Sequence, residues 1–94
     1  MAIEEFDWDK GNKSKNKIKH NVIPKEAEQA FLDKKSATFE DKEHSQLEKR
    51  YKLLGMTKRK RLLHITFTIR GGKVRVISAR DMSRKERKIY EQSK

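Results

Sequence analysis

One stretch of the chain, residues 62–79, constrains the fold more than any other. Its first half alternates strictly between polar and apolar residues, the apolar set being Leu63, Ile65, Phe67 and Ile69. A period of two predicts a β-strand with one buried and one exposed face. Gly71 and Gly72 separate this run from a second apolar run that begins at Val74. Because both glycines can adopt positive φ, the sequence predicts a two-residue β-hairpin.

Two further strands and a helix are predicted before this hairpin. Short apolar runs indicate strands over Ala37–Glu40 and Arg50–Met56. Pro24 suits the first position of a helix, because the N–H that it lacks would have no partner there. That helix gains one buried face from the spacing of Ala27, Ala30 and Phe31.

The two ends of the chain complete the predicted fold. An extended segment that lays its apolar side on the core is predicted from the alternation of Ile3, Phe6 and Trp8. Asp9 can cap a helix over Lys10–His20 that ends near Asn21. Ser83, with Glu86 three residues later, predicts a capping box at the start of a C-terminal helix. We therefore expect an α+β domain, with an antiparallel sheet of about four strands, two helices before it and one after it.

Size and composition indicate one small domain spanning residues 1–94. Only 33% of the 94 residues are apolar, which is enough to fill a single core. The acidic N-terminus lacks the apolar run of a signal peptide, and no stretch has the length of a membrane span. The chain has no cysteine, which excludes disulfides and thiolate metal sites. We expect a soluble, cytoplasmic protein that does not bind membranes.

The positive charge is concentrated in the second half of the chain. Residues 1–47 carry nine Lys and Arg against ten Asp and Glu, whereas residues 48–94 carry sixteen against four. The net charges of the two parts are therefore −1 and +12. A one-sided field of this kind favours a nucleic-acid backbone or an acidic protein as the partner. A lysine-rich surface that is merely solvated is the plainer alternative.

The remaining residue types favour metal-free RNA chemistry over other kinds of hydrolysis. No metal and no cofactor is expected, because the sequence has no metal-binding motif, phosphate loop or nucleophile elbow and only three scattered histidines, His20, His44 and His64. RNA cleavage needs neither, since the 2′-OH of the ribose is the nucleophile. The enzyme then supplies a base, an acid and cations.

A basic cluster near the C-terminus suits that chemistry. Arg80 directly follows an apolar strand, where a charge has little structural reason to be. Arg84 and Arg87 are three residues apart and share a helix face, and Tyr90 is three residues farther on. Guanidinium groups fit phosphate oxygens, and a tyrosine can stack on a base or transfer a proton. Alternatively, Tyr90 packs on the sheet as a core anchor and the arginines are simply exposed.

Several motifs, taken in order, resemble the BrnT family of toxins. They are F-x-W-D from Phe6, N-x-x-K-H from Asn16, F-x-D-x-x-H-S-x-x-E-x-R from Phe39, V-I-S-A-R from Val76 and E-R-x-x-Y from Glu86. The helix over residues 27–31, Gly55 and the strand over residues 62–67 match as well. The resemblance covers nearly the whole chain, and I-S-A-R with E-R-x-x-Y is its most specific part.

This resemblance implies a RelE-like ribonuclease fold. It also implies that the protein is the toxin of a type II toxin–antitoxin pair, and that this toxin cleaves RNA and inhibits translation. It also implies a hetero-oligomer with a BrnA-like antitoxin that carries a ribbon-helix-helix domain. The catalytic candidates are His44, Glu48, Arg50, Arg80, Arg87 and Tyr90. The RNA-binding candidates are Lys19, His20, Arg84 and, in a basic turn, Lys58, Arg59 and Arg61.

Structural alternatives accompany these assignments. Glu48 and Arg50, two residues apart on one strand face, could form an ion pair. For His20, the structural alternative is that histidine is favoured at the C-terminus of a helix by the helix dipole. His64, on the exposed face of its strand, is expected to make a cross-strand contact. The whole chain could instead be a non-catalytic basic module that binds nucleic acid or an acidic protein, with an affinity that falls steeply with salt.

Overall fold

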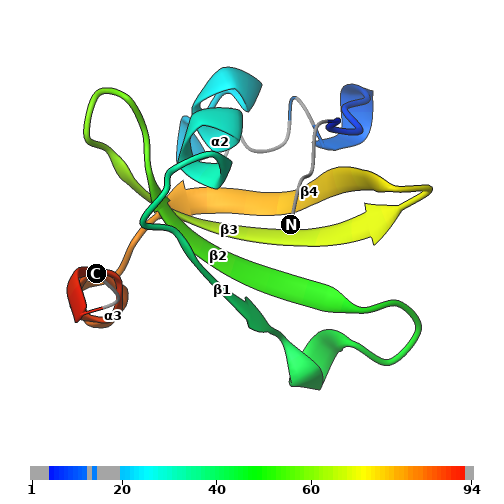
Figure 1. Ribbon diagram of the computed structural model, residues 1–94. Coiled ribbons are helices and arrows are strands. Elements are labelled where there is room, and N and C mark those ends of the chain that lie inside the picture. The colour runs from blue at the N-terminus through cyan, green and yellow to red at the C-terminus, as the bar shows by residue number, and fades with distance from the viewer. Residues whose placement is uncertain (1–4, 13, 15–19, 93–94) are drawn as a thin grey trace.

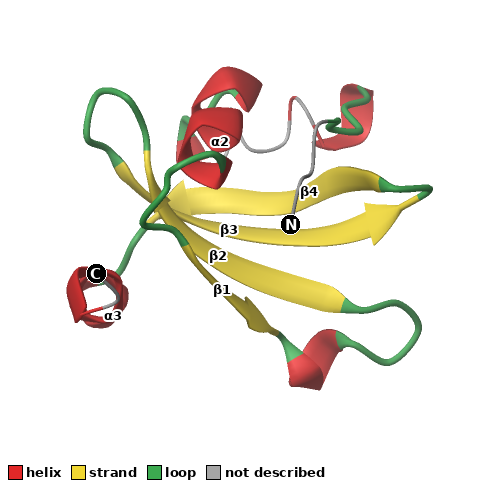
Figure 2. Ribbon diagram, in the orientation of Figure 1, coloured by secondary structure: helices red, strands yellow, loops and turns green. Residues whose placement is uncertain are grey.

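A four-stranded antiparallel sheet forms the centre of the computed structural model, which describes residues 5–12, 14 and 20–92 (Figure 1). The strand order is β1-β2-β3-β4. The strands are β1 (Ala37–Glu40), β2 (Arg50–Met56), β3 (Leu62–Arg70) and β4 (Lys73–Asp81). Helices α2 (Pro24–Phe31) and α3 (Arg84–Gln92) lie on opposite sides of the sheet, and a 3-10 helix, η1 (Lys42–His44), follows β1 (Figure 2). The predicted α+β class is confirmed.

The main core lies between α2 and one face of the sheet. Its buried residues are Val22, Ala27, Ala30, Leu53, Leu63, Ile65, Phe67, Val74, Val76 and Ala79. Phe6 and Trp8 pack against this core from the N-terminal segment, and Phe6 forms a parallel bridge with Val74. The predicted packing of these two aromatic residues is confirmed, whereas Ile3 lies outside the described residues.

Helix α2 packs closely against β2 at Gly55. A Cβ atom at this position would overlap the carbonyl oxygen of Ala30, so only glycine fits there. The Asp33 carboxylate, just after α2, accepts a hydrogen bond of 2.9 Å from the backbone N–H of Met56. These contacts fix α2 against the second strand.

The predicted hairpin is confirmed, and it carries a bulge that the sequence pattern did not indicate. Gly71 and Gly72 have φ values of +56° and +78°. Farther along the pair of strands, Phe67 pairs with Val76 whereas Thr66 pairs with Ser78, which leaves Ile77 as the extra residue. A bulge of this kind bends the strand and shifts its alternation by one residue. Arg75 and Arg80 therefore share a face of the sheet although their separation in sequence is odd.

The second face of the sheet is covered at one end by α3. Leu54, Met82 and Tyr90 form a small second core there, with Met56 and Leu62 packed against it. This cover contradicts the prediction that the polar face of the third strand is exposed.

Three residues of β3 differ in burial from what the alternation of polar and apolar residues predicted. His64 is 6% exposed because it lies on the α3 side, and Thr68 is 1% exposed with its hydroxyl donating to the carbonyl of Lys49 at 2.7 Å. Ile69, predicted to be buried, is 36% exposed and stands one residue before the end of the strand.

The predicted caps are confirmed where the structure describes them. Asp9 Oδ1 accepts a hydrogen bond of 3.1 Å from the N–H of Asn12, and Asn21 has the left-handed φ of 55°. Most of the predicted helix between them lies outside the described residues. The side chains of Ser83 and Glu86 each accept a hydrogen bond from the other's backbone N–H, at 3.2 and 2.8 Å. No helix among the described residues has the length and apolar character needed to cross a membrane.

Candidate functional site

Opposite α2, the sheet presents rows of side chains that cross its strands, and we call this surface the open face. The row nearest α3 holds Ala37, Leu54, His64 and Arg80. The middle row holds Phe39, Lys52, Thr66 and Ser78. The far row holds Arg50, Thr68 and Arg75, and Asp41 extends it, since its N–H donates to the carbonyl of Arg50 at 2.7 Å.

The far row opens into two adjoining hollows, which we call the arginine pocket. Glu48, Arg50 and Arg70 line both hollows, while His44 lines one and Arg75 the other. The three arginines come from β2, β3 and β4. The pocket therefore combines three guanidinium groups with a carboxylate and an imidazole, a set that suits binding of a phosphodiester.

The arginines of the pocket differ in their partners. Arg70 donates two hydrogen bonds of 3.1 Å to Glu48, and Arg75 forms an ion pair of 2.8 Å with Asp9. The bond from Arg70 is the main reason that the pKa of Glu48 lies below its usual value. In the part of the chain that the structure describes, Arg50 forms no ion pair.

The structural alternative for Glu48 and Arg50, an ion pair on one strand face, is therefore wrong, since the described residues contain no such pair. Glu48 precedes β2 rather than belonging to it, and its carboxylate instead reaches Arg70 on the neighbouring strand. Arg50 remains half-buried and lines both hollows of the pocket.

An Asp–His pair stands at the rim of the pocket. Nδ1 of His44 lies 2.9 Å from Oδ2 of Asp41, which is 7% exposed, whereas the His44 side chain is 58% exposed. Burial by itself raises the pKa of Asp41, but the hydrogen bond with His44 and the charge of Lys52 hold this pKa below its ordinary value. The hydroxyl of Ser45 donates to the carbonyl of Asp41 at 2.6 Å and so braces the turn.

Arg80, at the other end of the open face, has a structural partner. Its guanidinium donates hydrogen bonds of 2.9 and 3.0 Å to both carboxylate oxygens of Glu86, which also caps α3. The expectation that a charge here has little structural reason is thus wrong, because Arg80 ties β4 to the helix that follows. Burial opposes ionisation of Glu86, yet the bonds from Arg80 and Ser83 lower its pKa to about 2.

His64 is buried beside this pair. Its Nε2 lies 3.6 Å from Glu86, and its Nδ1 has no hydrogen-bond partner among the described residues. Burial, followed by the charge of Arg80, lowers the pKa of His64. The predicted cross-strand contact is confirmed, since His64 pairs with Arg80, but it lies inside the protein rather than on an exposed face.

The candidates of α3 point in different directions. Tyr90 is 4% exposed and its hydroxyl donates to Asp33, while Arg84 and Arg87 are exposed. Burial, together with the Asp33 carboxylate, raises the pKa of Tyr90 to about 12. Tyr90 therefore occupies the position of a core anchor and does not share a surface with the two arginines.

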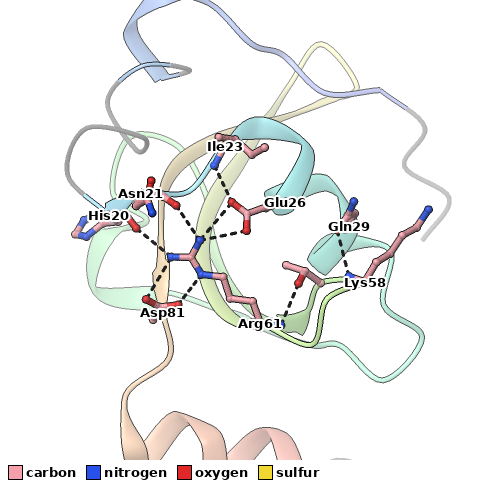
Figure 3. Close-up of polar contacts among 9 residues, drawn as sticks. His20, Asn21, Ile23, Glu26, Gln29, Lys58, Arg61 and Asp81 are labelled. Carbon is pink, nitrogen blue, oxygen red and sulfur yellow. Dashed lines mark hydrogen bonds and ion pairs between the residues drawn. The ribbon is translucent and has the colours of Figure 1, made fainter.

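Of the basic side chains in the turn between β2 and β3, some are bound within the fold and others are exposed (Figure 3). Arg61 donates to Asp81 at 2.8 Å, to Glu26 at 3.2 Å, and to the carbonyls of Asn21 and His20 at 2.8 and 3.1 Å. Its guanidinium is therefore occupied within the fold. The other RNA-binding candidates of this region are the exposed residues Lys58, Arg59 and His20, while Lys19 lies outside the described residues.

Three residues of the site were missed by the sequence analysis: Asp41, Arg70 and Arg75. Each had a weak signal, since Asp41 belongs to the motif that starts at Phe39 and the two arginines alternate with apolar residues. Only the strand register brings them beside His44 and Arg50. Among the described residues, no group of three or more His, Cys, Asp or Glu is placed to hold a metal ion.

Comparison with known protein families gives one match. The family model of the ribonuclease toxin BrnT, of type II toxin–antitoxin systems, matches residues 8–86. This range contains all four strands and every residue of the arginine pocket, but it ends before Arg87 and Tyr90. A search of curated proteins found no match.

Proposed function

Because the chain belongs to the BrnT family of ribonuclease toxins of type II toxin–antitoxin systems, we propose that it is a metal-independent endoribonuclease that cleaves RNA in the arginine pocket and thereby inhibits translation. One observation carries this proposal. Arg50, Arg70 and Arg75, from three neighbouring strands, line the two adjoining hollows of the arginine pocket with Glu48, and His44 lines one of them. These residue types can supply both the cations and the proton transfer that RNA cleavage needs.

Arg50 and Arg70 bind the scissile phosphate in this proposal. Arg50 has no ion pair among the described residues, so a phosphate need not displace an internal carboxylate. Arg70 is oriented by Glu48 through two hydrogen bonds. Guanidinium groups held in this way stabilise the negative charge that develops on the phosphate oxygens during attack.

His44 acts as the general base. In its neutral form it accepts the proton of the 2′-OH as that oxygen attacks the phosphorus atom and a cyclic phosphate forms. As the P–O2′ bond forms, the P–O5′ bond breaks, and the leaving 5′-oxygen takes up a proton from solvent water. The imidazolium then returns its proton to the solvent. The bond to Asp41 holds the imidazole through Nδ1, which leaves Nε2 for this transfer.

The antitoxin is proposed to be an acidic BrnA-like protein with a ribbon-helix-helix domain that joins the toxin in a hetero-oligomer. The positive excess of residues 48–94, a net charge of +12, supports an acidic segment as the part that covers the toxin. Co-expression with the neighbouring gene, followed by purification and measurement of mass, tests this assembly. A toxin that purifies alone and still inhibits growth in the presence of that gene contradicts it.

The proposed activity is tested with pure protein and RNA in the presence of EDTA. The wild type should cut RNA, and Arg50→Ala should cut it about 100- to 1,000-fold more slowly, as is typical for loss of one group that stabilises the transition state. Lys25→Ala, which removes an exposed cation of α2 on the opposite side of the sheet, is the control and should cut normally. Binding of RNA by the wild type without any cutting would indicate a non-catalytic module instead.

The same assay separates this pocket from the site predicted at Arg80 and Arg87. If the pocket performs the chemistry, Arg87→Ala retains most of the cutting. If Arg87→Ala and Arg80→Ala, both shown to be folded, lose cutting while Arg50→Ala retains it, the reaction takes place beside α3. Mapping of RNA 5′ ends in cells that express each variant connects the cutting to translation arrest.

A further inference from the structure

We propose that Phe39 is a stacking platform for a base of single-stranded RNA beside the arginine pocket. This inference rests on the proposed function, because it names the subsite next to the proposed cleavage position. Phe39 lies on the edge strand β1, and its partner across the strands is Lys52.

Phe39 differs from every other phenylalanine of the chain. The remaining three pack in a row, with centroid distances of 5.4 Å from Phe6 to Phe31 and 5.0 Å from Phe31 to Phe67. Phe39 belongs to neither core cluster, makes no ring contact with any described residue and is 47% exposed. An aromatic ring that contributes so little to the core is available to a ligand.

The surroundings of Phe39 suit a nucleotide. The middle row of the open face continues from Phe39 to Lys52 and then to two hydroxyl groups, and none of its four residues is buried. Lys52, like Arg50, has no ion pair among the described residues. The row thus places a flat apolar ring beside a cation that forms no ion pair with the described residues, the combination that binds single strands by base stacking and phosphate attraction.

The distance to the pocket also fits. Arg50 is two residues from Lys52 along β2, and Asp41 is two residues from Phe39, so the middle and far rows lie roughly 7 Å apart. Asp41 is the residue that holds His44. A base on Phe39 would therefore belong to a nucleotide adjoining the phosphate bound by Arg50, and the stacking would hold that phosphate in register with His44.

The cations favour RNA over a protein as the occupant of this row. A protein segment that covered Phe39 would need both an apolar group over the ring and a carboxylate placed on Lys52, because burying this charge without a partner is unfavourable. An RNA strand brings a base and a phosphate together. Its phosphate satisfies the cation while its base covers the ring.

The test uses an oligonucleotide that cannot be cut, a short RNA with 2′-O-methyl groups, and measures its binding by fluorescence anisotropy. Phe39→Leu keeps the apolar character but removes the aromatic face, and it should weaken binding between about 5- and 100-fold. Phe39→Trp should bind at least as tightly as the wild type. Leu32→Ala, which removes a side chain 67% exposed on the segment after α2, is the control and should bind normally.

Two outcomes overturn the inference. The first is that Phe39→Leu binds the oligonucleotide as the wild type does. The second is that it loses affinity only for the antitoxin, which would make Phe39 a protein contact. Failure of the proposed function has a different result. The wild-type protein would then leave unmodified RNA intact, however tightly the Phe39 variants bind the oligonucleotide. In cutting assays, Phe39→Leu should raise KM more than it lowers kcat.

Discussion

The hydroxyl group of Tyr90 donates a hydrogen bond of 2.5 Å to the carboxylate of Asp33, which lies 57 residues earlier in the chain. The same carboxylate accepts the backbone N–H of Met56. One side chain of α3 is thereby joined to the end of α2 and to the end of β2. This three-way contact explains why a tyrosine occupies the position.

Tyr90→Phe should lower the free energy of unfolding by about 1–2 kcal/mol, because the variant leaves a partly buried carboxylate without one of its donors. Urea unfolding measures this change. Tyr51→Phe is the control, since its hydroxyl has no hydrogen-bond partner among the described residues, and it should change stability by less than about 0.5 kcal/mol. Folded Tyr90→Phe should still cut RNA, and loss of cutting would restore Tyr90 as a catalytic candidate.

Arg61→Ala should destabilise the protein by about 2–4 kcal/mol. The variant removes charged hydrogen bonds to Asp81 and Glu26 as well as bonds to two backbone carbonyls. Arg61→Lys should recover only part of this loss, because an ammonium group cannot reproduce the planar fork. Thermal or urea unfolding measures both variants against Arg59→Ala, an exposed arginine of the same turn, for which little change is expected. Equal stability of Arg61→Ala and Arg59→Ala would contradict this role.

Glu86 predicts a loss of stability in acid. Its pKa falls from 4.5 in the unfolded chain to about 2 in the fold. A depressed pKa means that the folded state favours the ionised carboxylate, so its stabilising contribution is present above about pH 4.5 and is lost as the pH falls toward 2. Glu86→Gln should flatten this part of the stability curve, as measured by urea unfolding between pH 6 and pH 3. The control Glu91→Gln, on the exposed side of α3, should keep the wild-type slope.

Asp41→Asn tests whether the Asp–His pair positions the proton-transfer group. The amide cannot hold the imidazole as the carboxylate does, so kcat should fall at least about 10-fold while KM changes little. Glu40→Gln, an exposed neighbour, is the control. A variant that loses binding and catalysis equally, or that fails to fold, would show that Asp41 only braces the turn.

Much of the local structure was predictable because its causes lie within a few residues. Pro24 at the start of α2, the paired glycines of the hairpin and the reciprocal bonds of Ser83 with Glu86 all appear where the sequence indicates them. The error at His64 has a different origin. A period of two reveals one buried face, but burial of the second face depends on α3, which begins twenty residues later.

In the candidate site, too, single residues were predictable from the sequence, whereas contacts between distant residues were not. The sequence indicated His44, Glu48 and Arg50 as candidates, and the structure brings them together in one pocket. It could not indicate Arg70 and Arg75 as their neighbours, because the proximity of β2 to β3 and β4 depends on the register of the strands. Nor could it show that Glu48 pairs with Arg70 rather than with Arg50.

The sequence by itself determined the order of the helices and strands, the family and the concentration of positive charge in the second half of the chain, since these follow from residue types and local spacing. The tertiary structure decided which cations have carboxylate partners within the fold and which have none among the described residues. Arg61 and Arg80 are occupied by carboxylates brought to them by folding, whereas Arg50 is not. Charge is a property of each residue, but the availability of a charge depends on the acidic groups that the fold places beside it.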